Sequence, residues 1–364
     1  MEKLSQNNIK TRLYFIDMAR TIAILLMLEG HFVHDSLAAI WENDAYPAYV
    51  IWKTIRGFTS PIFLTVTGLV FTYLLMGNDQ IEFWHNKRVR RGFKRVIELL
   101  FWGYLLQYYA FHVLQCIALG ILCIIVVYGV YRIIKIIPLW IYYFLLGTFM
   151  FSTYIFFGDL GDTYWPKGAP MLIQNVFHGP HSLFPITPHM AYTLYGAMLG
   201  VLIYRYKQYI KTKGVILGAF LLGLSLFVFV KPLFIWLSTS SFYLYKLDWL
   251  FEKFGVVLMV LSILLALETF ILNIKKDSLF LKIGQNTLSI YIIHMILLYG
   301  SIIHIGINDF LHKKLDPIEL IGYTSVFISI FIVFVYFIDR IRSGLSFILL
   351  PIKMYTNRLF GITD

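Results

Sequence analysis

The sequence repeats apolar stretches of about 20 residues, separated by short polar or basic segments. About 20 apolar residues form a helix long enough to cross the hydrocarbon core of a bilayer. The strands of an outer-membrane barrel would instead alternate apolar and polar residues over about 10 positions. The repeat therefore predicts an all-α fold, a polytopic membrane helix bundle.

Composition excludes the other broad classes. Hydrophobic residues make up 59% of the chain and charged residues only 14%, whereas a soluble domain has about 25% charged residues. A soluble globular enzyme and a disordered chain are both excluded. The net charge of +11 does not indicate a nucleic-acid partner, because the basic residues fall at the ends of the apolar stretches.

The apolar pattern predicts about ten membrane-spanning helices. No internal repeat or linker interrupts them, so residues 1–364 are expected to form a single integral-membrane domain. The expected spans are 15–35, 52–76, 93–112, 113–131, 136–157, 188–206, 213–236, 250–272, 283–304 and 318–338.

The basic residues predict the orientation of the chain. With the N-terminus inside, 23 of the 31 Lys and Arg residues fall on inner segments. Cytoplasmic loops are enriched in these residues, so both termini are expected in the cytoplasm. Histidine has the opposite bias, because seven of the ten histidines fall at the outer side. The longest outer connection, 158–187, either only seals the bundle or covers an outward-facing site.

The first expected helix has a polar stripe along one face. Arg20 and His31 are eleven positions apart, so they lie within about 20° of one face and about 16.5 Å apart along the axis. Asp17, His34 and Asp35 lie near the same face. Ionisable groups inside a membrane usually face a cavity or a partner. Alternatively, Arg20 is an anchor that reaches the membrane surface and His31 makes an interhelical hydrogen bond.

Two other expected helices also have polar faces. Arg56 and Ser60 are four positions apart, next to Pro61, and either line a cavity or belong to a kinked packing helix. Tyr291 and His294 share a face of the ninth helix, and His294 lies about as deep as His31 by the helical rise. Two imidazoles at one depth suggest one site, although packing alone would also explain each of them.

The basic run KRVRRGFKR at 87–95 is either an ordinary loop on the inner side or a binding site for the phosphates of a nucleotide-like ligand. No phosphate-binding glycine motif and no metal-ligand spacing occurs in the sequence, so no metal is expected. No nucleophilic serine elbow is present either.

The stretch from Asp17 through Arg20 to His31 resembles the signature of the acyltransferase-3 family. It resembles more closely its relatives with the heparan-α-glucosaminide N-acetyltransferase-like catalytic domain. The resemblance covers residues 12–300, with Thr21 in place of the usual glycine. Its further blocks are RGFTSPIFLTVTGL, KRVRRGFKRVIELLFWGYLLQ, HVLQCIALG, PHMAYTLYGAMLG and IGQNTLSIYIIH.

The resemblance implies a ten-helix acyltransferase of a bacterial inner (cell) membrane. Such a protein takes an acyl group, often acetyl, from cytoplasmic acyl-CoA as donor substrate and holds no permanent cofactor. It delivers the group to a hydroxyl or amine of an extracytoplasmic carbohydrate acceptor. By this resemblance His31 matches the catalytic histidine and Arg20 the donor-side arginine. His31 would act as a general base or accept the acyl group covalently.

These expectations define a candidate site. His31, Arg20 and His294 are the candidate catalytic residues. The acceptor is expected on the outer side, beneath the 158–187 loop. The candidate substrate-binding residues are Asp17, His34, Asp35, Arg56, Ser60, His189 and Tyr291.

Two rival functions remain open. A transporter or a lipid or glycan flippase would also need polar groups near the membrane midplane, although the sequence has no inverted repeat. A structural or assembly partner would need no aligned arginine and histidine. The sequence does not decide between a monomer and a homo-oligomer.

Overall fold

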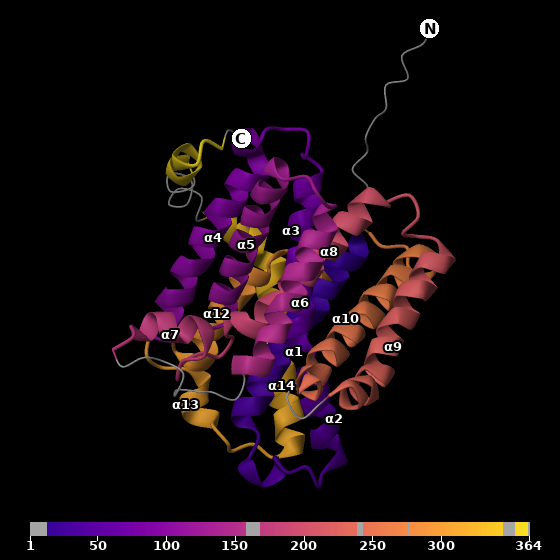
Figure 1. Ribbon diagram of the computed structural model, residues 1–364. Coiled ribbons are helices and arrows are strands. Elements are labelled where there is room, and N and C mark those ends of the chain that lie inside the picture. Colours follow the sequence, from indigo (N-terminus) through magenta and orange to yellow (C-terminus); the bar gives the residue numbers. More distant parts are fainter. Residues whose placement is uncertain (1–12, 158–167, 239–242, 276, 345–353, 363–364) are drawn as a thin grey trace.

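The computed structural model describes residues 13–157, 168–238, 243–275, 277–344 and 354–362. These residues form a bundle of long helices with no strand among them (Figure 1). The all-α expectation is therefore confirmed. Seven of the predicted spans each correspond to one long helix among the described residues: α1 (Tyr14–Ser36), α5 (Val113–Ile133), α6 (Leu139–Phe157), α8 (Ile186–Arg205), α9 (Lys213–Leu237), α10 (Asp248–Ala266) and α14 (Pro317–Gly344). Helix α10 ends six residues before its predicted end, and α14 continues six residues beyond its own. The short elements are η1 (Ala39–Trp41), η2 (Phe83–His85), α7 (Met171–Phe177), η4 (Leu244–Leu247), the π-helical turn η5 (Leu267–Ile271) and α13 (Ile307–Leu311).

Seven helices of the described chain are long and apolar enough to cross a membrane, and a bent pair would make an eighth. The protein is thus an integral membrane protein. Helices α1 and α4 (Lys87–Leu106) are not among the seven, because several charged side chains interrupt each of them. Whether they also span the bilayer, which would give ten spans, remains a prediction.

The predicted span at 93–112 is shifted in the structure. Helix α4 begins six residues earlier, at Lys87, and ends at Leu106. The side chain of Asn86 accepts a hydrogen bond of 2.8 Å from the backbone N–H of Arg88, which satisfies one of the free donors at a helix start. The basic run at 87–95 is therefore the first half of a helix and not a loop.

Two predicted spans are broken into two helices each. The 52–76 span consists of α2 (Pro47–Arg56) and α3 (Thr59–Met76), which separate shortly before Pro61, a residue without a backbone N–H. The 283–304 span consists of α11 (Leu279–Gln285) and α12 (Thr287–Tyr299), bent by 77°. Arg342 of α14 donates a hydrogen bond of 2.8 Å to the Asn286 side chain at this bend. Helix α12 ends at Tyr299, and the φ of +64° at the next residue, Gly300, lies in the left-handed region that favours glycine.

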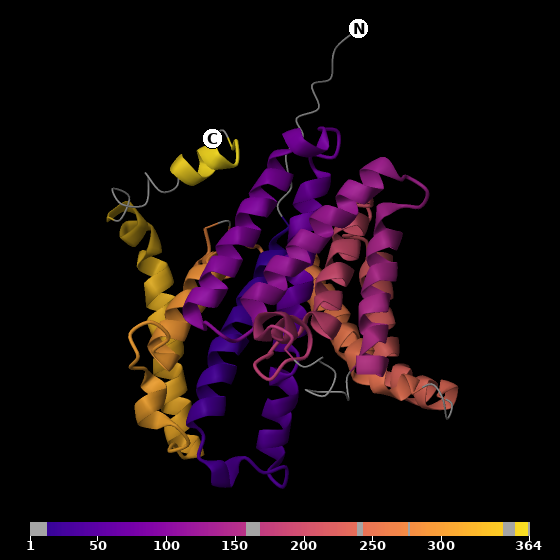
Figure 2. The same cartoon turned by 60° about the vertical axis from the view of Figure 1, so that its left-hand side comes forward.

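Helices α3 and α8 cross at a very close distance. A Cβ atom on Gly68 would lie 1.9 Å from the carbonyl oxygen of Thr193, and one on Gly196 would lie 1.9 Å from that of Thr65. The absence of side chains at both glycines lets the two backbones touch. Helices α9 and α10 pack together at one flank (Figure 1), and α14 runs along another (Figure 2).

The start of α1 and the C-terminal residues 354–362 lie at the same end of the bundle (Figures 1 and 2). We call this end the inner end and the opposite one the outer end. Lys94 of α4 donates hydrogen bonds to the side chains of Thr356 (2.9 Å) and Asn357 (2.8 Å), which hold the C-terminal segment against the inner half of α4.

Candidate functional site

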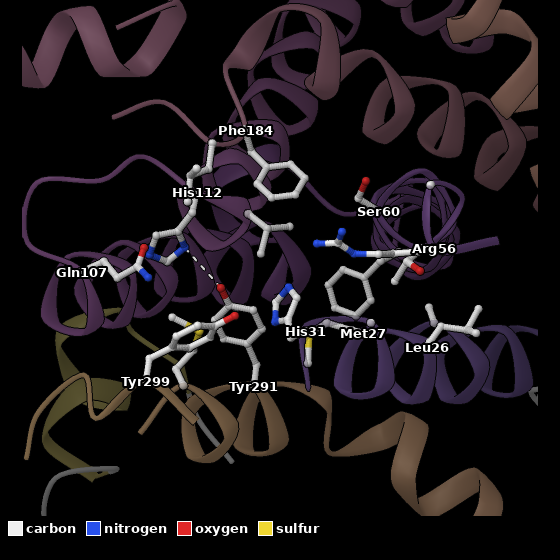
Figure 3. A pocket seen from close by; sticks show the side chains of 18 of the residues that line it. Leu26, Met27, His31, Arg56, Ser60, Gln107, His112, Phe184, Tyr291 and Tyr299 are labelled. Atoms are coloured by element: carbon white, nitrogen blue, oxygen red, sulfur yellow. Dashed lines mark hydrogen bonds between the residues drawn. The ribbon is translucent and has the colours of Figure 1, made fainter. Parts of the chain in front are cut away.

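A cavity of about 370 Å³ lies in the outer half of the bundle, which we call the outer cavity. Helices α1, α2, α3, α10 and α12 supply most of its wall, and Leu183 and Phe184 before α8 close one side. Figure 3 shows His31, Arg56 and Phe184 around its space. His31, Arg56, Ser60 and Tyr291 from the predicted site line this cavity.

The two mid-membrane histidines contact each other. Nδ1 of His31 lies 3.1 Å from Nε2 of His294, a hydrogen-bond distance. His294 is fully buried behind His31, on α12. His31 also lines the outer cavity (Figure 3), so its ring lies between His294 and this cavity. The helical rise placed both rings at one depth, and the packing of α12 beside α1 makes them one unit.

A second hydrogen bond joins Tyr291 to His112, the residue just before α5 (Figure 3). The Tyr291 hydroxyl lies 3.3 Å from Nδ1 of His112, and both residues line the outer cavity. The ring of Tyr291 also packs edge-on against His294, with centroids 4.8 Å apart. Tyr291 is thereby fixed beside the histidine pair.

A smaller cavity of about 180 Å³, the inner cavity, lies closer to the inner end. Among the described residues that line it, Arg20 and Arg95 are the cations, and most of the others are aliphatic or aromatic. Arg20 donates a 3.3 Å hydrogen bond to the hydroxyl of Thr287, the first residue of α12, and lies 3.8 Å from Asp17. Arg20 therefore faces a cavity, and Arg95 comes from the basic run at 87–95.

The two cavities share two lining residues, Phe63 and Tyr291. Their rings form the partition between the inner cavity with its arginines and the outer cavity with His31. If one molecule entered the inner cavity and a second entered the outer cavity, the two molecules would meet at this partition.

The remaining predicted residues lie outside both cavities. His34 is exposed at the end of α1, and Asp17 pairs with Arg20. Asp35 accepts a 2.7 Å hydrogen bond from Tyr299, whose ring lines the outer cavity. His189 is turned toward the backbone oxygen of Pro185, 3.1 Å from its Nδ1. Residues 158–167 of the predicted outer loop lie outside the described residues.

Sequence reasoning did not assign several lining residues. His112, Tyr299, Lys53 and Lys253 line the outer cavity but belong to no recognisable motif. His112 had one signal, its position immediately before an apolar stretch. Its partner Tyr291 is 179 positions away, and no periodicity connects positions so far apart.

The chain matches the family model described as heparan-alpha-glucosaminide N-acetyltransferase, catalytic, over residues 12–239. The match includes Arg20, His31 and Arg56 and ends before His294. A comparison with curated protein sequences gave no match. The matched range is more than half of the chain, and it contains the cavity-lining arginine and histidine of α1. The chain therefore belongs to the heparan-alpha-glucosaminide N-acetyltransferase catalytic-domain family, a family of acetyltransferases.

Proposed function

We propose that the protein moves an acetyl group from cytoplasmic acyl-CoA to a hydroxyl or amine of an extracytoplasmic sugar or glycan. One observation carries this proposal: the inner and outer cavities meet at Phe63 and Tyr291, and His31 lines the outer one. A donor and an acceptor that approach from opposite membrane faces need a common point at which a base is available.

His31 is the proposed general base. When its Nδ1–H donates to Nε2 of His294, the lone pair of its Nε2 is free on the cavity side. His294 then carries its own proton on Nδ1, a buried atom that has no hydrogen-bond partner among the described residues. In this role His294 is a positioning residue that selects the useful tautomer of His31.

The proposed reaction needs no redox partner. The acceptor oxygen or nitrogen attacks the thioester carbonyl carbon while Nε2 of His31 takes its proton. The carbon–sulfur bond then breaks, and the sulfur of CoA leaves with the proton from His31. In the covalent alternative, Nε2 of His31 attacks the thioester first and transfers the acyl group in a second step.

The inner cavity suits the donor. Its apolar wall matches the pantetheine arm, and the guanidinium groups of Arg20 and Arg95 suit carbonyl or phosphate oxygens. The thioester would reach the partition with its acyl group toward His31. The family match is independent support, because an acetyltransferase needs an acyl donor.

The test is donor binding together with transfer. Purified protein is heated with acetyl-CoA, with desulfo-CoA, which lacks the thiol, and without ligand. We expect both ligands to raise the melting temperature, since ligands that bind only the folded state stabilise it. Mass spectrometry of envelope glycans from cells with and without the protein should then differ by one acetyl group. Absence of both effects would contradict the proposal.

A transporter or flippase is the second candidate, because the 77° bend between α11 and α12 lies beside the site and broken helices are typical of transporters. Proteoliposomes loaded with acetyl-CoA and given an external glycan distinguish the two functions. The proposed enzyme acetylates the glycan outside and leaves free CoA inside, whereas a transporter moves one of the two molecules unchanged.

A further inference from the structure

Three cations converge on the outer cavity. Lys53 and Arg56 come from α2, and Lys253 comes from α10 across the break between α2 and α3. The terminal carbon Cε of Lys253 lies 3.9 Å from the position of a Cβ atom on Gly57, the residue after Arg56. Two helices that are far apart in the sequence thus bring positive charge to one side of the cavity.

No carboxylate is among the described residues that line the outer cavity. Three nearby carboxylates already have partners, and for Asp44 this partner is Lys53, one of the three cations. Asp44 pairs with Lys53 at 3.1 Å, Glu29 accepts the indole N–H of Trp52 at 2.7 Å, and Asp35 accepts from Tyr299. Arg56 and Lys253 make no ion pair within 4 Å in the described part of the chain.

Arg56 is held by packing that leaves its charged end free. Its side-chain carbon Cγ lies 3.2 Å from the position of a Cβ on Gly30, next to His31, and its guanidinium lies over the Trp52 ring at 5.5 Å. Figure 3 shows the guanidinium pointing into the cavity between Phe184 and His31. An unpaired cation at this depth is costly and usually marks a ligand or an ion path.

The start of α3 faces the same place. Thr59 and Ser60, its first two residues, line the cavity, and the N-terminus of an 18-residue helix carries partial positive charge. The hydroxyl oxygen of Thr59 is buried and has no hydrogen-bond partner among the described residues. A helix start, a hydroxyl donor and two unpaired cations together form the kind of site that binds an oxyanion.

We propose that the acceptor is anionic, and that Arg56, Lys253 and the start of α3 bind its phosphate or carboxylate while a neighbouring hydroxyl or amine faces His31. This inference rests on the proposed function and names the class of its acceptor. Because Gly30 contacts Arg56 and precedes His31, the acylated group lies within about one sugar ring of the charged group.

The first test measures binding without chemistry. Inorganic phosphate, glucose 6-phosphate, glucuronate and neutral glucose are titrated against purified full-length protein at constant ionic strength, and binding is followed by thermal shift. We expect the anions to stabilise the protein and glucose not to do so. Arg56→Gln and Lys253→Gln should each weaken anion binding by about tenfold or more, as for a hydrogen bond to a charged group.

The control is Lys231→Gln, which removes an exposed lysine of α9 that lines neither cavity and should leave binding unchanged. Arg56→Lys keeps the charge and should retain part of the affinity. Phosphate-only binding would assign a phosphorylated acceptor, and glucuronate-only binding a uronate. Equal shifts in all variants, or no preference over glucose, would overturn the inference.

The second test examines the product. Envelope glycans acetylated only in cells that contain the protein are deacetylated and separated by anion exchange. Retention as an anion agrees with the inference, and a neutral product overturns it while leaving the acetyltransferase proposal intact. If no acetylated product forms but anion binding still depends on Arg56 and Lys253, the proposed function fails and the binding site stands.

Discussion

The proposed chemistry depends on a single atom, Nε2 of His31, which takes the proton of the acceptor. His31→Ala removes it, and we expect acyl transfer to fall by about 10²- to 10⁴-fold, the usual contribution of a general base. Donor affinity, measured by thermal shift with acetyl-CoA, should remain, because His31 lines only the outer cavity. His85→Ala is the matched control, since His85 is exposed beside Glu82 at the inner end. Wild-type transfer in His31→Ala would show that another group accepts the proton.

A substitution of Arg20 distinguishes a role in donor binding from a role as a membrane anchor. Arg20→Lys keeps the charge but loses the planar fork that contacts Thr287 and faces the inner cavity. We expect the dissociation constant for acetyl-CoA to rise by about tenfold, with the protein still folded. Arg205→Lys, at the inner end of α8 and outside both cavities, should have no effect. An unchanged constant in Arg20→Lys would favour a membrane anchor.

We expect the ring of Tyr291, as part of the partition, to keep water in the outer cavity away from the donor. Tyr291→Ala removes the ring that lines both cavities, so water from the outer cavity should reach the thioester. We expect faster release of CoA from acetyl-CoA in the absence of acceptor. Tyr291→Phe keeps the ring and loses only the contact with His112, so it should retain slow hydrolysis. Equal hydrolysis in both variants would mean that Tyr291 does not separate donor from water.

The helices that carry the site are supported by the close crossing of α3 and α8. Gly196→Ala would place a Cβ atom 1.9 Å from the Thr65 carbonyl oxygen, so the helices must move apart. Such overpacking costs about 1–3 kcal/mol or more, and we expect a lower melting temperature together with weaker transfer. Gly218→Ala on α9 has no atom within 4 Å of the new Cβ and should be neutral or slightly stabilising. Equal melting temperatures for the two variants would contradict the close crossing.

The proposal requires the whole molecule to be oriented so that the two cavities open toward opposite faces of the membrane. Gln80→Cys, between α3 and α4, and Met171→Cys, at the start of α7, report on the two ends. A membrane-impermeant thiol reagent applied to intact cells should label position 171 and not position 80. The native cysteines lie in α5, where Cys116 is buried and Cys123 half-buried, and the unmodified protein gives their background. Labelling of position 80 from outside would reverse the orientation and the assignment of donor and acceptor cavities.

The sequence alone determined the helical class, the order of the helices and the stripe on α1. These properties depend on local features: apolar stretches matched to a bilayer, and a period of 3.6 residues that puts Arg20 and His31 on one face. The same local reasoning missed the starts and breaks of helices. Asn86 caps α4 earlier than its apolar stretch begins, and the bend at Asn286 is held by Arg342 from α14.

The site itself was decided by tertiary packing. The pairs His31–His294 and Tyr291–His112 join positions 263 and 179 residues apart. Lys253 approaches Arg56 only because α10 packs beside the break between α2 and α3. Depth in a membrane can be counted along a helix, but which helices touch depends on how their surfaces fit, and small residues such as Gly68 and Gly196 set that fit. The sequence therefore supplies the reactive groups and their depth, and only the packing of the helices makes them one site.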